Sequence, residues 1–506
     1  MRKALLTLSL AAAAFLGNAQ TVIYVDKDAT GMNNGVSWAS AYTSLEKALN
    51  DNIVTGAEIW IAEGTYTPSY SYTFFDIRLG EKLYGGFSGT ETSLGQRNPE
   101  LYKTVLSGDI NGDDANNAFT DNAGRIIRVH PYDPTNTLND EEVVVLDGLT
   151  ISGAYNPIEE GGGLGTDYPG VRQKGLRING CIFENNTALY QSAFNFYTSH
   201  EAPVLEVSNS IFRNNVSHQA YLLEFRVNSM IGNAKEATFI NNLFENNTTG
   251  SAVTSGGGIG GRFVNQTVGT FDIQYTNNTF VGNKNDAANF NKCLFVLERG
   301  GSANADIIID FDNNLFYENE HLDNIAMDNT SNSNTKYVGA NCLNNGGDWN
   351  QLNSFVGSIV SSTSPFEDYA AGDFRPTTAY ATQGDSASYQ STWTNFDLAG
   401  EERRDAVTGS IAIGAYQPKV SGVSLVERAS VDLSIYPNPA TNYLTITQAE
   451  DITGVAVYSM IGQRMLSQQN DFGTTMKLDI ADLPAGTYLL QANTAQGPQA
   501  VQFVKK

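Results

Sequence analysis

The chain has 506 residues, which is enough for more than one domain with a sizeable core. Its 30 basic and 54 acidic residues give a formal net charge of −24, which argues against nucleic acid and anionic lipid as partners because both would repel the protein. The 48 glycines and the scarcity of helical periods favour an all-β chain rich in turns.

The N-terminus has the pattern of a secretory signal peptide, which we place at residues 1–19. Two basic residues precede an apolar run, Ala4 to Leu16, that is too short to span a bilayer comfortably. Gly17 and Ala19 are the small residues that signal peptidase requires, so we expect cleavage between Ala19 and Gln20. An uncleaved anchor is the alternative. No later stretch approaches the roughly twenty apolar residues of a membrane helix, so we expect no transmembrane segment in the mature chain.

A candidate metal site lies in the segment Asp109–Asp114. Asp109, Asn111 and Asp113 offer oxygen ligands at a spacing that suits Ca²⁺. The segment lacks the glycine at the sixth position and the distal glutamate of an EF-hand loop. A turn stabilised by Asp and Asn side chains, without a metal, explains the pattern equally well.

A motif of phenylalanine, any two residues and asparagine occurs five times in the middle of the chain. The copies are Phe183–Asn186, Phe212–Asn215, Phe244–Asn247, Phe280–Asn283 and Phe316–Asn319. Successive phenylalanines are 29, 32, 36 and 36 positions apart, the variation expected when a repeating unit keeps its core positions while its loops vary in length. The motif therefore predicts a solenoid.

Each repeat contains an alternating segment, such as Leu176–Phe183, whose period of two predicts a strand with one inward face. One strand cannot bury that face alone. Parallel stacking at about 4.8 Å would place Phe on Phe in the core, and each turn asparagine could bond to its equivalents above and below. The glycine segments Gly161–Leu164 and Gly256–Ile259 are expected at corners of the coil. Independent hairpins in a sandwich are the alternative.

Three cysteines, Cys181, Cys293 and Cys342, cannot all pair within one chain, so at most one disulfide is possible. A chain of this length does not need a disulfide, and small buried cysteines are the alternative. The sequence has no CxxC spacing, and its four histidines lie far apart. We therefore expect no cofactor other than Ca²⁺.

A candidate catalytic set lies on the segment Asp306–Asp312. Asp306, Asp310 and Asp312 fall on one strand face by the period of two, with Arg299 shortly before them. This geometry permits a metal site or acid–base chemistry. The same alternation equally describes a solvated outer face opposite three apolar residues.

The repeats and the glycine segments together resemble the right-handed parallel β-helix proteins of the pectate-lyase-like and polymorphic outer-membrane protein families. The stretch Tyr24–Leu49 is similar to the opening of many secreted β-helix proteins, in which a short amphipathic helix caps the open end of the coil. Here Ser44 can N-cap that helix, with Leu45, Ala48 and Leu49 on its apolar side. Glu58–Ala62 is then expected to be the first strand of the coil.

The resemblance covers most of residues 21–418. We expect an all-β protein in which residues 20–418 form a right-handed parallel β-helix with an N-terminal cap. Small residues make 419–430 a predicted linker. Alternating segments at Tyr443–Thr447, Val455–Tyr458 and Thr487–Ala492 predict a small immunoglobulin-like β-sandwich in residues 431–506.

The last residues resemble the C-terminal sorting domain of the type IX secretion system. The resemblance rests on the basic end of the chain and on two motifs, formed by Tyr436, Pro437, Asn438 and Pro439 and by Leu483, Pro484, Gly486 and Tyr488. It implies that the tail binds the type IX translocon and that the protein reaches the cell surface or the exterior. An ordinary binding module at the end of an enzyme is the alternative.

Two functions follow for the body. The first is a non-catalytic adhesin or carbohydrate-binding solenoid with an extended binding face for extracellular polysaccharide. The second is a polysaccharide lyase or glycoside hydrolase acting on acidic polysaccharides, since both activities occur in β-helix proteins. A lyase of this kind needs acidic residues that hold Ca²⁺ and a basic residue, whereas a hydrolase needs two carboxylates.

Overall fold

The computed structural model describes the chain from residue 22 to residue 506 with gaps. The described residues are 22–51, 57–130, 143–158, 161–166, 173–219, 221–228, 234–250, 258–265, 269–286, 293–299, 306–320, 324–328, 335–345, 356–380, 384, 397–401, 403, 411–418, 433–447, 452–459, 464–469, 474–481, 483–484, 486–494 and 499–506. The predicted signal peptide and its cleavage site at Ala19 and Gln20 lie outside these residues. Two compact units are present, Met1–Lys419 and Val420–Lys506.

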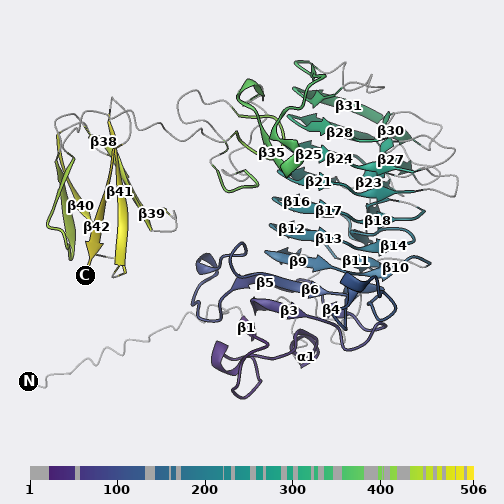
Figure 1. The fold of residues 1–506 in the computed structure, drawn as a ribbon, viewed down its shortest axis with the longest axis horizontal. Helices are drawn as coiled ribbons and strands as arrows, with labels where there is room; N and C mark the ends of the chain where they lie inside the picture. Colours follow the sequence, from purple (N-terminus) through teal and green to yellow (C-terminus); the bar gives the residue numbers. More distant parts are fainter. Residues whose placement is uncertain are drawn as a thin grey trace, which may run out of the picture. The chain divides into compact units, whose positions relative to one another are not determined.

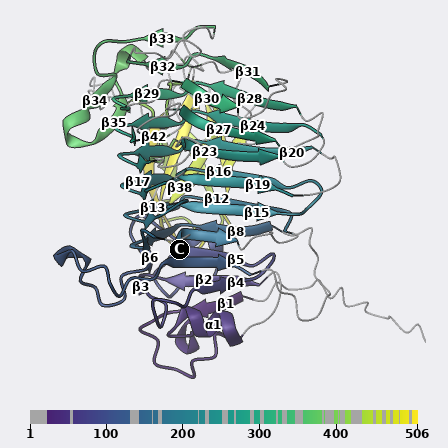
Figure 2. The ribbon, with the colours of Figure 1, turned by 90° about the vertical axis from the view of Figure 1, so that its right-hand side faces the viewer.

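The first unit is a stack of parallel strands in four sheets (Figures 1 and 2). Sheet A contains β1 (Val22–Val25), β2 (Glu58–Ala62), β5 (Lys82–Phe87), β8 (Val143–Asp147), β12 (Gly175–Asn179), β16 (Val204–Ser208), β20 (Lys235–Ile240), β24 (Phe271–Thr276), β28 (Ile307–Asp312) and β31 (Thr335–Ala340). Sheet B contains β3 (Gly64–Tyr66), β6 (Thr104–Ser107), β9 (Leu149–Ser152), β13 (Ile182–Glu184), β17 (Ile211–Arg213), β21 (Leu243–Glu245), β25 (Thr279–Val281), β29 (Leu315–Tyr317), β32 (Leu343–Asn344) and β33 (Ile359–Val360).

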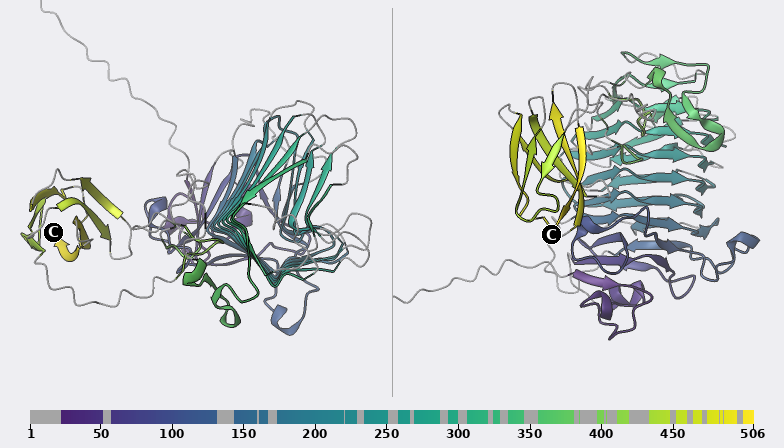
Figure 3. Two further views of the ribbon diagram at one scale, coloured as in Figure 1. Left: turned by 90° about the horizontal axis from the view of Figure 1, so that it is seen from above. Right: turned by 60° about the vertical axis from the view of Figure 1, so that its left-hand side comes forward.

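The other two sheets complete each turn of the coil. Sheet D contains β10 (Tyr155–Asn156), β14 (Thr187–Ala188), β18 (Val216–Ser217), β22 (Thr248–Thr249) and β26 (Lys284–Asn285). Sheet C contains β4 (Phe75–Ile77), β7 (Arg125–Val129), β11 (Gly162–Thr166), β15 (Phe194–Thr198), β19 (Leu223–Val227), β23 (Gly258–Asn265), β27 (Cys293–Arg299) and β30 (Asn324–Asp328). The chain passes from sheet A to B, D and C before it returns to A one strand further along. Seen along the stack, the strands of each sheet superimpose (Figure 3, left). The expected parallel β-helix is confirmed.

The five phenylalanines of the repeat motif form one column in the core. Their ring centroids are 5.2, 5.0, 4.5 and 4.9 Å apart from Phe183 to Phe316, and each pair is stacked. In-register pairing of the sheet B strands sets this spacing, since Phe183, Phe212 and Phe244 are direct partners across the strands. The predicted column of Phe on Phe is therefore confirmed.

The last asparagine of each motif forms a buried ladder beside that column. Asn215 is typical: its side-chain oxygen accepts bonds from the backbone N–H and the amide of Asn186, at 3.2 and 3.0 Å. Its own amide donates to the oxygens of Phe183 and Asn247, at 2.8 and 2.9 Å. The ladder pairs backbone groups at the turn that would otherwise be buried without partners.

A second column lies at the turn from sheet A to sheet B. Its members are Cys181, Ser210, Asn242, Asn278, Asn314 and Cys342. Each side-chain oxygen from Ser210 to Asn314 accepts a bond from the backbone N–H one coil earlier. All three cysteines of the chain are buried and unbridged.

The segment Leu176–Phe183, which was expected to be one alternating strand, is two strands in different sheets. β12 ends at Asn179, and Gly180 turns the chain in the left-handed region with φ of 58° before β13 begins at Ile182. The alternation of inward and outward side chains continues across the turn, because Ile178 and Phe183 are both buried. A local alternation cannot report such a corner.

The N-terminal cap is α1 (Leu45–Asp51), which lies at the purple end of the stack in Figure 1. As expected, Ser44 caps the helix, since its hydroxyl accepts a bond from the N–H of Lys47 at 3.2 Å, and Leu45, Ala48 and Leu49 are buried. Glu58–Ala62 is a strand but not the first one of the coil, because β1 pairs with it in parallel and lies at the edge of sheet A.

Short 3₁₀ helices and a hairpin complete the first unit. The helices are η1 (Trp38–Ser40), η2 (Leu94–Gln96), η3 (Asp114–Asn116), η4 (Tyr369–Ala371) and η5 (Thr378–Tyr380), and the hairpin joins β34 (Phe366–Asp368) to β35 (Asp373–Pro376). Phe366 and Phe374 of the hairpin share a buried cluster with Val281 and Leu315 of sheet B. The hairpin therefore covers the outer face of sheet B near its C-terminal end.

The second unit is built from two antiparallel sheets. One contains β36 (Ser434–Tyr436), β37 (Tyr443–Thr447) and β40 (Thr475–Asp479); the other contains β39 (Arg464–Gln469), β38 (Ile452–Ser459), β41 (Gly486–Thr494) and β42 (Gln499–Lys505). A core that includes Leu444, Val457, Leu490 and Phe503 joins them. The expected small β-sandwich is confirmed. Among the described residues, no helix is long and apolar enough to span a membrane.

Candidate functional site

A pocket of about 580 Å³ opens beneath the loop that connects β6 to β7. The rings of Phe119 and Tyr155 form one wall, stacked at 4.9 Å with an angle of 19° between their planes. The carboxylates of Asp109 and Asp114 lie on the loop side. The pocket thus combines an aromatic surface with polar groups that can fix a ligand's orientation.

The floor of the pocket comes from successive coils. Tyr155 follows β9, Asn185 follows β13 and Asn214 follows β17, and all three line the pocket. Each of these strands belongs to sheet B, so the same corner of the coil supplies the floor three times. The repeat places Asn185 and Asn214 in one row, because Glu184 and Arg213 are direct partners, whereas Tyr155 begins β10 and is paired with Thr187, two residues further along the coil.

The loop above the pocket is closed at its base and held by its own acids. The N–H of Ala123 donates to the oxygen of Gly108 at 2.8 Å, which joins the two ends of the loop. The Asp109 carboxylate accepts bonds from the N–H groups of Gly112, Asp113 and Asp114, at 2.7, 3.0 and 3.2 Å. Asp109 therefore shapes the turn directly, as the predicted metal-free turn requires.

Asn122 ties the loop to the coil. It is buried, and its amide donates to the two Asp114 oxygens at 3.0 and 3.2 Å and to the oxygen of Gly153 at 2.8 Å. Burial, together with nearby carboxylates such as Asp109 and Asp121, raises the pKa of Asp113 and of Asp114 above their usual values. The loop concentrates negative charge at one rim of the pocket.

The residues predicted to bind Ca²⁺ lie on this loop. Asp109 and Asp113 come close to a third acid, Asp121, with carboxylate oxygens that lie within 4.8 Å of one another. Asn111 is exposed, and its backbone N–H donates to Asp121 at 2.9 Å. Calcium binding here stays a prediction, for which the structure brings Asp121 rather than Asn111 beside the other two acids.

The structure places the candidate catalytic acids on the outer face of sheet A. Ile307, Ile309 and Phe311 of β28 are fully buried, whereas Asp310 and Asp312 point away from them and are half-buried, with Asp306 directly before the strand. Partial burial and the neighbouring Asp312 raise the pKa of Asp310 to about 6.

Arg299 is not on the same sheet as these acids. It ends β27 in sheet C, whereas β28 belongs to sheet A, and the Arg299 side chain lies outside the described part of the structure. Within the described residues, Asp310 has no ion-pair partner and its Oδ1 has no hydrogen-bond donor. Sequence proximity of Arg299 to Asp306 therefore does not place them on one face.

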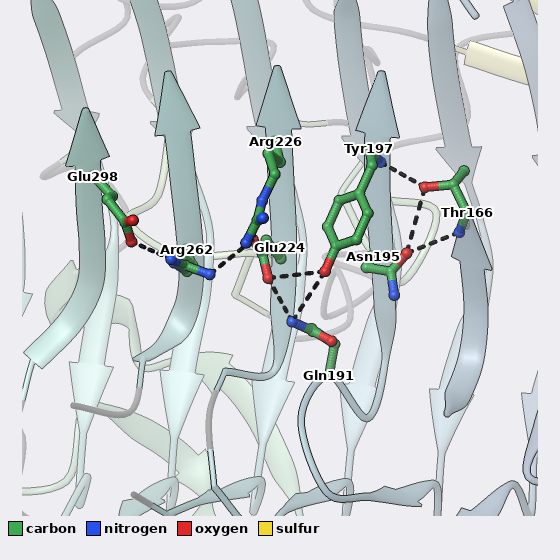
Figure 4. Close-up of polar contacts among 8 residues, drawn as sticks. All are labelled: Thr166, Gln191, Asn195, Tyr197, Glu224, Arg226, Arg262 and Glu298. Atoms are coloured by element: carbon green, nitrogen blue, oxygen red, sulfur yellow. Dashed lines mark hydrogen bonds and ion pairs between the residues drawn. The ribbon is translucent and has the colours of Figure 1, made fainter. Parts of the chain in front are cut away.

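A buried polar network crosses the outer face of sheet C (Figure 4). Glu224 on β19 is fully buried, and its carboxylate accepts bonds from Arg226, Arg262, Gln191 and Tyr197.

Although burial disfavours the charged form of Arg262, the carboxylate of Glu224 and an ion pair with Glu298 hold its pKa above the usual value. Two carboxylates balance two guanidinium groups, and every oxygen of Glu224 is used. We therefore interpret this network as structural, because both oxygens of its central carboxylate are engaged and both guanidinium groups are paired with carboxylates.

The residues of the pocket were largely missed by sequence reasoning. Asp114 belongs to the acidic segment that was examined for calcium, but Phe119, Asn122 and Tyr155 have no motif of their own. Only the spacing of the repeat, extended backwards from Phe183 to Ile151, could have placed Tyr155 opposite Thr187, two residues after Asn185, because Ile151 and Phe183 are direct partners in sheet B.

The predicted sorting residues cluster at one edge of the second unit. The side chain of Asn438 accepts a bond from the N–H of Val504 at 2.9 Å and donates to the backbone oxygen of Gln502 at 3.3 Å. It therefore satisfies two backbone groups at the edge of β42. Tyr488 donates from its hydroxyl to the oxygen of Pro484 at 2.8 Å, which joins two residues of the second motif.

Comparison with known proteins identifies the second unit. Residues 434–506 match the family described as the secretion system C-terminal sorting domain. No curated protein matches the chain. The chain therefore carries a type IX sorting domain, which directs secretion across the outer membrane to the cell surface or the exterior.

Proposed function

We propose that the solenoid is a non-catalytic carbohydrate-binding body, which its sorting domain delivers to the cell surface or the exterior. The observation that supports this function is the pocket beneath the β6–β7 loop, where Phe119 and Tyr155 face carboxylates and amides. A sugar ring has an apolar face of C–H groups and a polar edge of hydroxyl groups. The pocket offers a partner for each, namely an aromatic wall and hydrogen-bonding side chains.

The site is also placed where a large ligand can reach it. Its floor consists of turn residues on the outside of the coil, and Asn185 and Asn214 are exposed. A solenoid presents such turns in a long row, which suits an extended extracellular polysaccharide. The type IX translocon is the other partner, through the sorting domain.

A second candidate is a polysaccharide lyase or hydrolase, and one observation favours it. Asp310 has a pKa raised to about 6 beside a second carboxyl group, Asp312, and a carboxyl group with a raised pKa is the general acid of many glycosidases. The two acids are neighbours on one strand face, so their Cα atoms lie about 7 Å apart. This candidate predicts product formation, whereas the binding function does not.

The test is a carbohydrate array probed with the secreted full chain, with calcium and with a chelator. We expect retention on one class of polysaccharide and loss of that retention in Tyr155→Ala, because the stacked wall is removed. The matched control is Tyr443→Ala, which removes an exposed tyrosine from the other unit, outside both sorting motifs. Equal retention of Tyr155→Ala and the unchanged protein would contradict the proposed site.

The same incubations distinguish binding from catalysis. Absorbance of unsaturated sugars and reducing-end assays should stay at background on every retained polysaccharide. Products that form with the unchanged protein and disappear in Asp310→Asn would replace the binding function by the enzymatic one. A chelator effect on retention would support the predicted calcium site at Asp109 and Asp113.

A further inference from the structure

We propose that the pocket is the centre of a longer track, which binds an internal stretch of a linear, neutral polysaccharide along the stack. The track runs from Tyr70 and Tyr72, through Phe119 and Tyr155, to Asn246. This inference rests on the proposed function and deepens it, because it specifies the length and the charge of the ligand.

Tyr70 and Tyr72 form an aromatic platform in the loop between β3 and β4. The two residues are 59% and 72% exposed, yet their rings stack in parallel, with centroids 5.3 Å apart and 3° between the planes. The turn is fixed by Thr73, whose hydroxyl accepts from the Tyr70 N–H at 3.0 Å and donates to the Tyr70 oxygen at 2.9 Å. A platform held in advance loses little conformational entropy when a sugar ring stacks on it.

The platform is joined to the pocket by the backbone. The oxygen of Ser71 accepts from the N–H of Gly124 at 3.4 Å, and the oxygen of the preceding Ala123 accepts from the N–H of Tyr155 at 3.0 Å. Two such hydrogen-bonded steps and one step along the chain place the Cα atoms of Ser71 and Tyr155 at most about 18 Å apart. The two aromatic pairs therefore lie within the span of one short oligosaccharide.

Exposed asparagines continue the track on the other side of the pocket. Asn185, Asn214 and Asn246 occupy the same turn of successive coils in the left-handed region, with φ of 56°, 55° and 51°. Each precedes a buried ladder asparagine, so the ladder fixes its position. Within the described residues, the side-chain amides of Asn185 and Asn214 have no hydrogen-bond partner, and an amide both donates to and accepts from sugar hydroxyls.

The track has a defined upper end. In the coil after Asn246 the same turn holds Gly282, where a Cβ would meet the Asn246 side-chain oxygen at 2.3 Å and the Tyr369 hydroxyl at 3.8 Å. Tyr369 belongs to η4 in the segment that covers sheet B. From β3 to β21 the track spans five strand steps in sheet B, or about 24 Å.

The charge of the track selects a neutral polymer. Asp109 and Asp114 line the pocket, and Asp113 and Asp121 lie on the same loop. These acids and the net charge of −24 repel carboxylated or sulfated chains. A neutral chain, by contrast, offers hydroxyl donors to the same carboxylates.

The experiment is calorimetric titration of the full chain with neutral manno-, xylo- and cello-oligosaccharides, each graded from disaccharide to octasaccharide. For the bound series we expect affinity to rise with length until the track is filled. Tyr72→Ala should lower the affinity for the octasaccharide by about tenfold, the order that one stacked aromatic contact contributes, and leave the disaccharide unchanged.

Three further variants separate the track from the pocket. Tyr72→Trp should preserve the octasaccharide affinity, since it keeps the platform, and Asn214→Gly should lower it several-fold without strain in the left-handed backbone. Tyr155→Ala should weaken the disaccharide and the octasaccharide alike.

Equal affinity for both lengths, or an octasaccharide affinity that Tyr72→Ala leaves intact, would overturn the track while the pocket stands. Tighter binding of oligogalacturonides than of every neutral series would overturn the neutral ligand. Absence of binding by every series would overturn the proposed function and the track together.

Discussion

The two units of the protein use asparagine for the same physical task in different ways. In the solenoid, side chains such as Asn215 and Asn247 satisfy backbone groups at the same turn of five successive coils, and each neighbour in the ladder bonds to the next. In the sorting domain, the side chain of Asn438 bonds to the backbone of β42 without any such ladder around it in the described residues. The two units therefore differ in how the sequence specifies them: a repeated spacing specifies the solenoid, whereas two short motifs characterise the tail.

The strongest way to test this comparison is to separate the units. Deletion of residues 431–506 should abolish surface delivery, because the sorting domain matched at 434–506 is lost while the first unit keeps its own core. Cell fractionation measures the outcome, and circular dichroism of the retained protein should still show β structure. A truncated protein that still reaches the surface would contradict the assignment of the tail.

Breaking one ladder position should cost the solenoid about 4 kcal/mol. The buried Asn247 side chain makes four hydrogen bonds, to Asn215 twice, to Phe212 and to Asn283, and each is worth about 1 kcal/mol. Urea unfolding of Asn247→Ala measures the loss. The matched control is the adjacent exposed Asn246→Gly, which keeps the left-handed turn and should change stability by less than about 1 kcal/mol.

The free energy of unfolding should depend on pH by about 3 kcal/mol through one buried residue of the N-terminal coil, Glu81. Glu81 is fully buried, and burial raises its pKa to about 7, although the N–H of Arg78 donates to its carboxylate. Between the ordinary value near 4.5 and about 7 the native state binds more protons than the unfolded state, so stability falls as the pH rises through this window. Converting the shift gives about 3 kcal/mol.

The variant that isolates the pH dependence due to Glu81 is Glu81→Gln. It keeps a side-chain oxygen that accepts the bond from the Arg78 N–H, and it cannot ionise. Denaturation at several pH values should show the decline only in the unchanged protein, so the two should differ most above pH 7. Parallel pH profiles would refute the assignment to Glu81.

The smallest expected effect is in the tail. Asn438→Ala removes two side-chain bonds to β42, both at an exposed position where water replaces part of each, and should lower the stability of the sorting domain by about 1 kcal/mol in total. Hydrogen exchange at Val504 should accelerate and surface delivery should decrease. Asn442→Ala, at an exposed position nearby, should leave both unchanged; equal effects would show that the loss is not specific to the edge of β42.

Features that repeat or lie close together in the chain could be predicted from the sequence. The phenylalanine column and the asparagine ladder follow from a spacing, and the Ser44 cap follows from residues within one helical turn. The boundary at Gly180 could not be predicted, because a corner between two sheets leaves the alternation of Leu176–Phe183 intact.

Contacts between distant segments also lay beyond the sequence. The amide of Asn277 donates to the oxygen of Ala412 at 2.9 Å, and the N–H of Gly414 donates to the oxygen of Asn313 at 2.8 Å. These bonds join segments more than a hundred residues apart, and no local pattern encodes them. The pocket is similar, since Phe119 meets Tyr155 only after two coils have stacked.

The cysteines at the two ends of the column between sheets A and B bear on how the protein survives export. A secreted chain passes through an oxidising compartment, and the thiolate is the form of cysteine that reacts there. Burial raises the pKa of Cys181 and of Cys342 to about 12, so both thiols stay protonated once the coil has formed. Burial in the folded stack therefore protects these thiols from oxidation. We expect them to be open to oxidation only before the coil has folded.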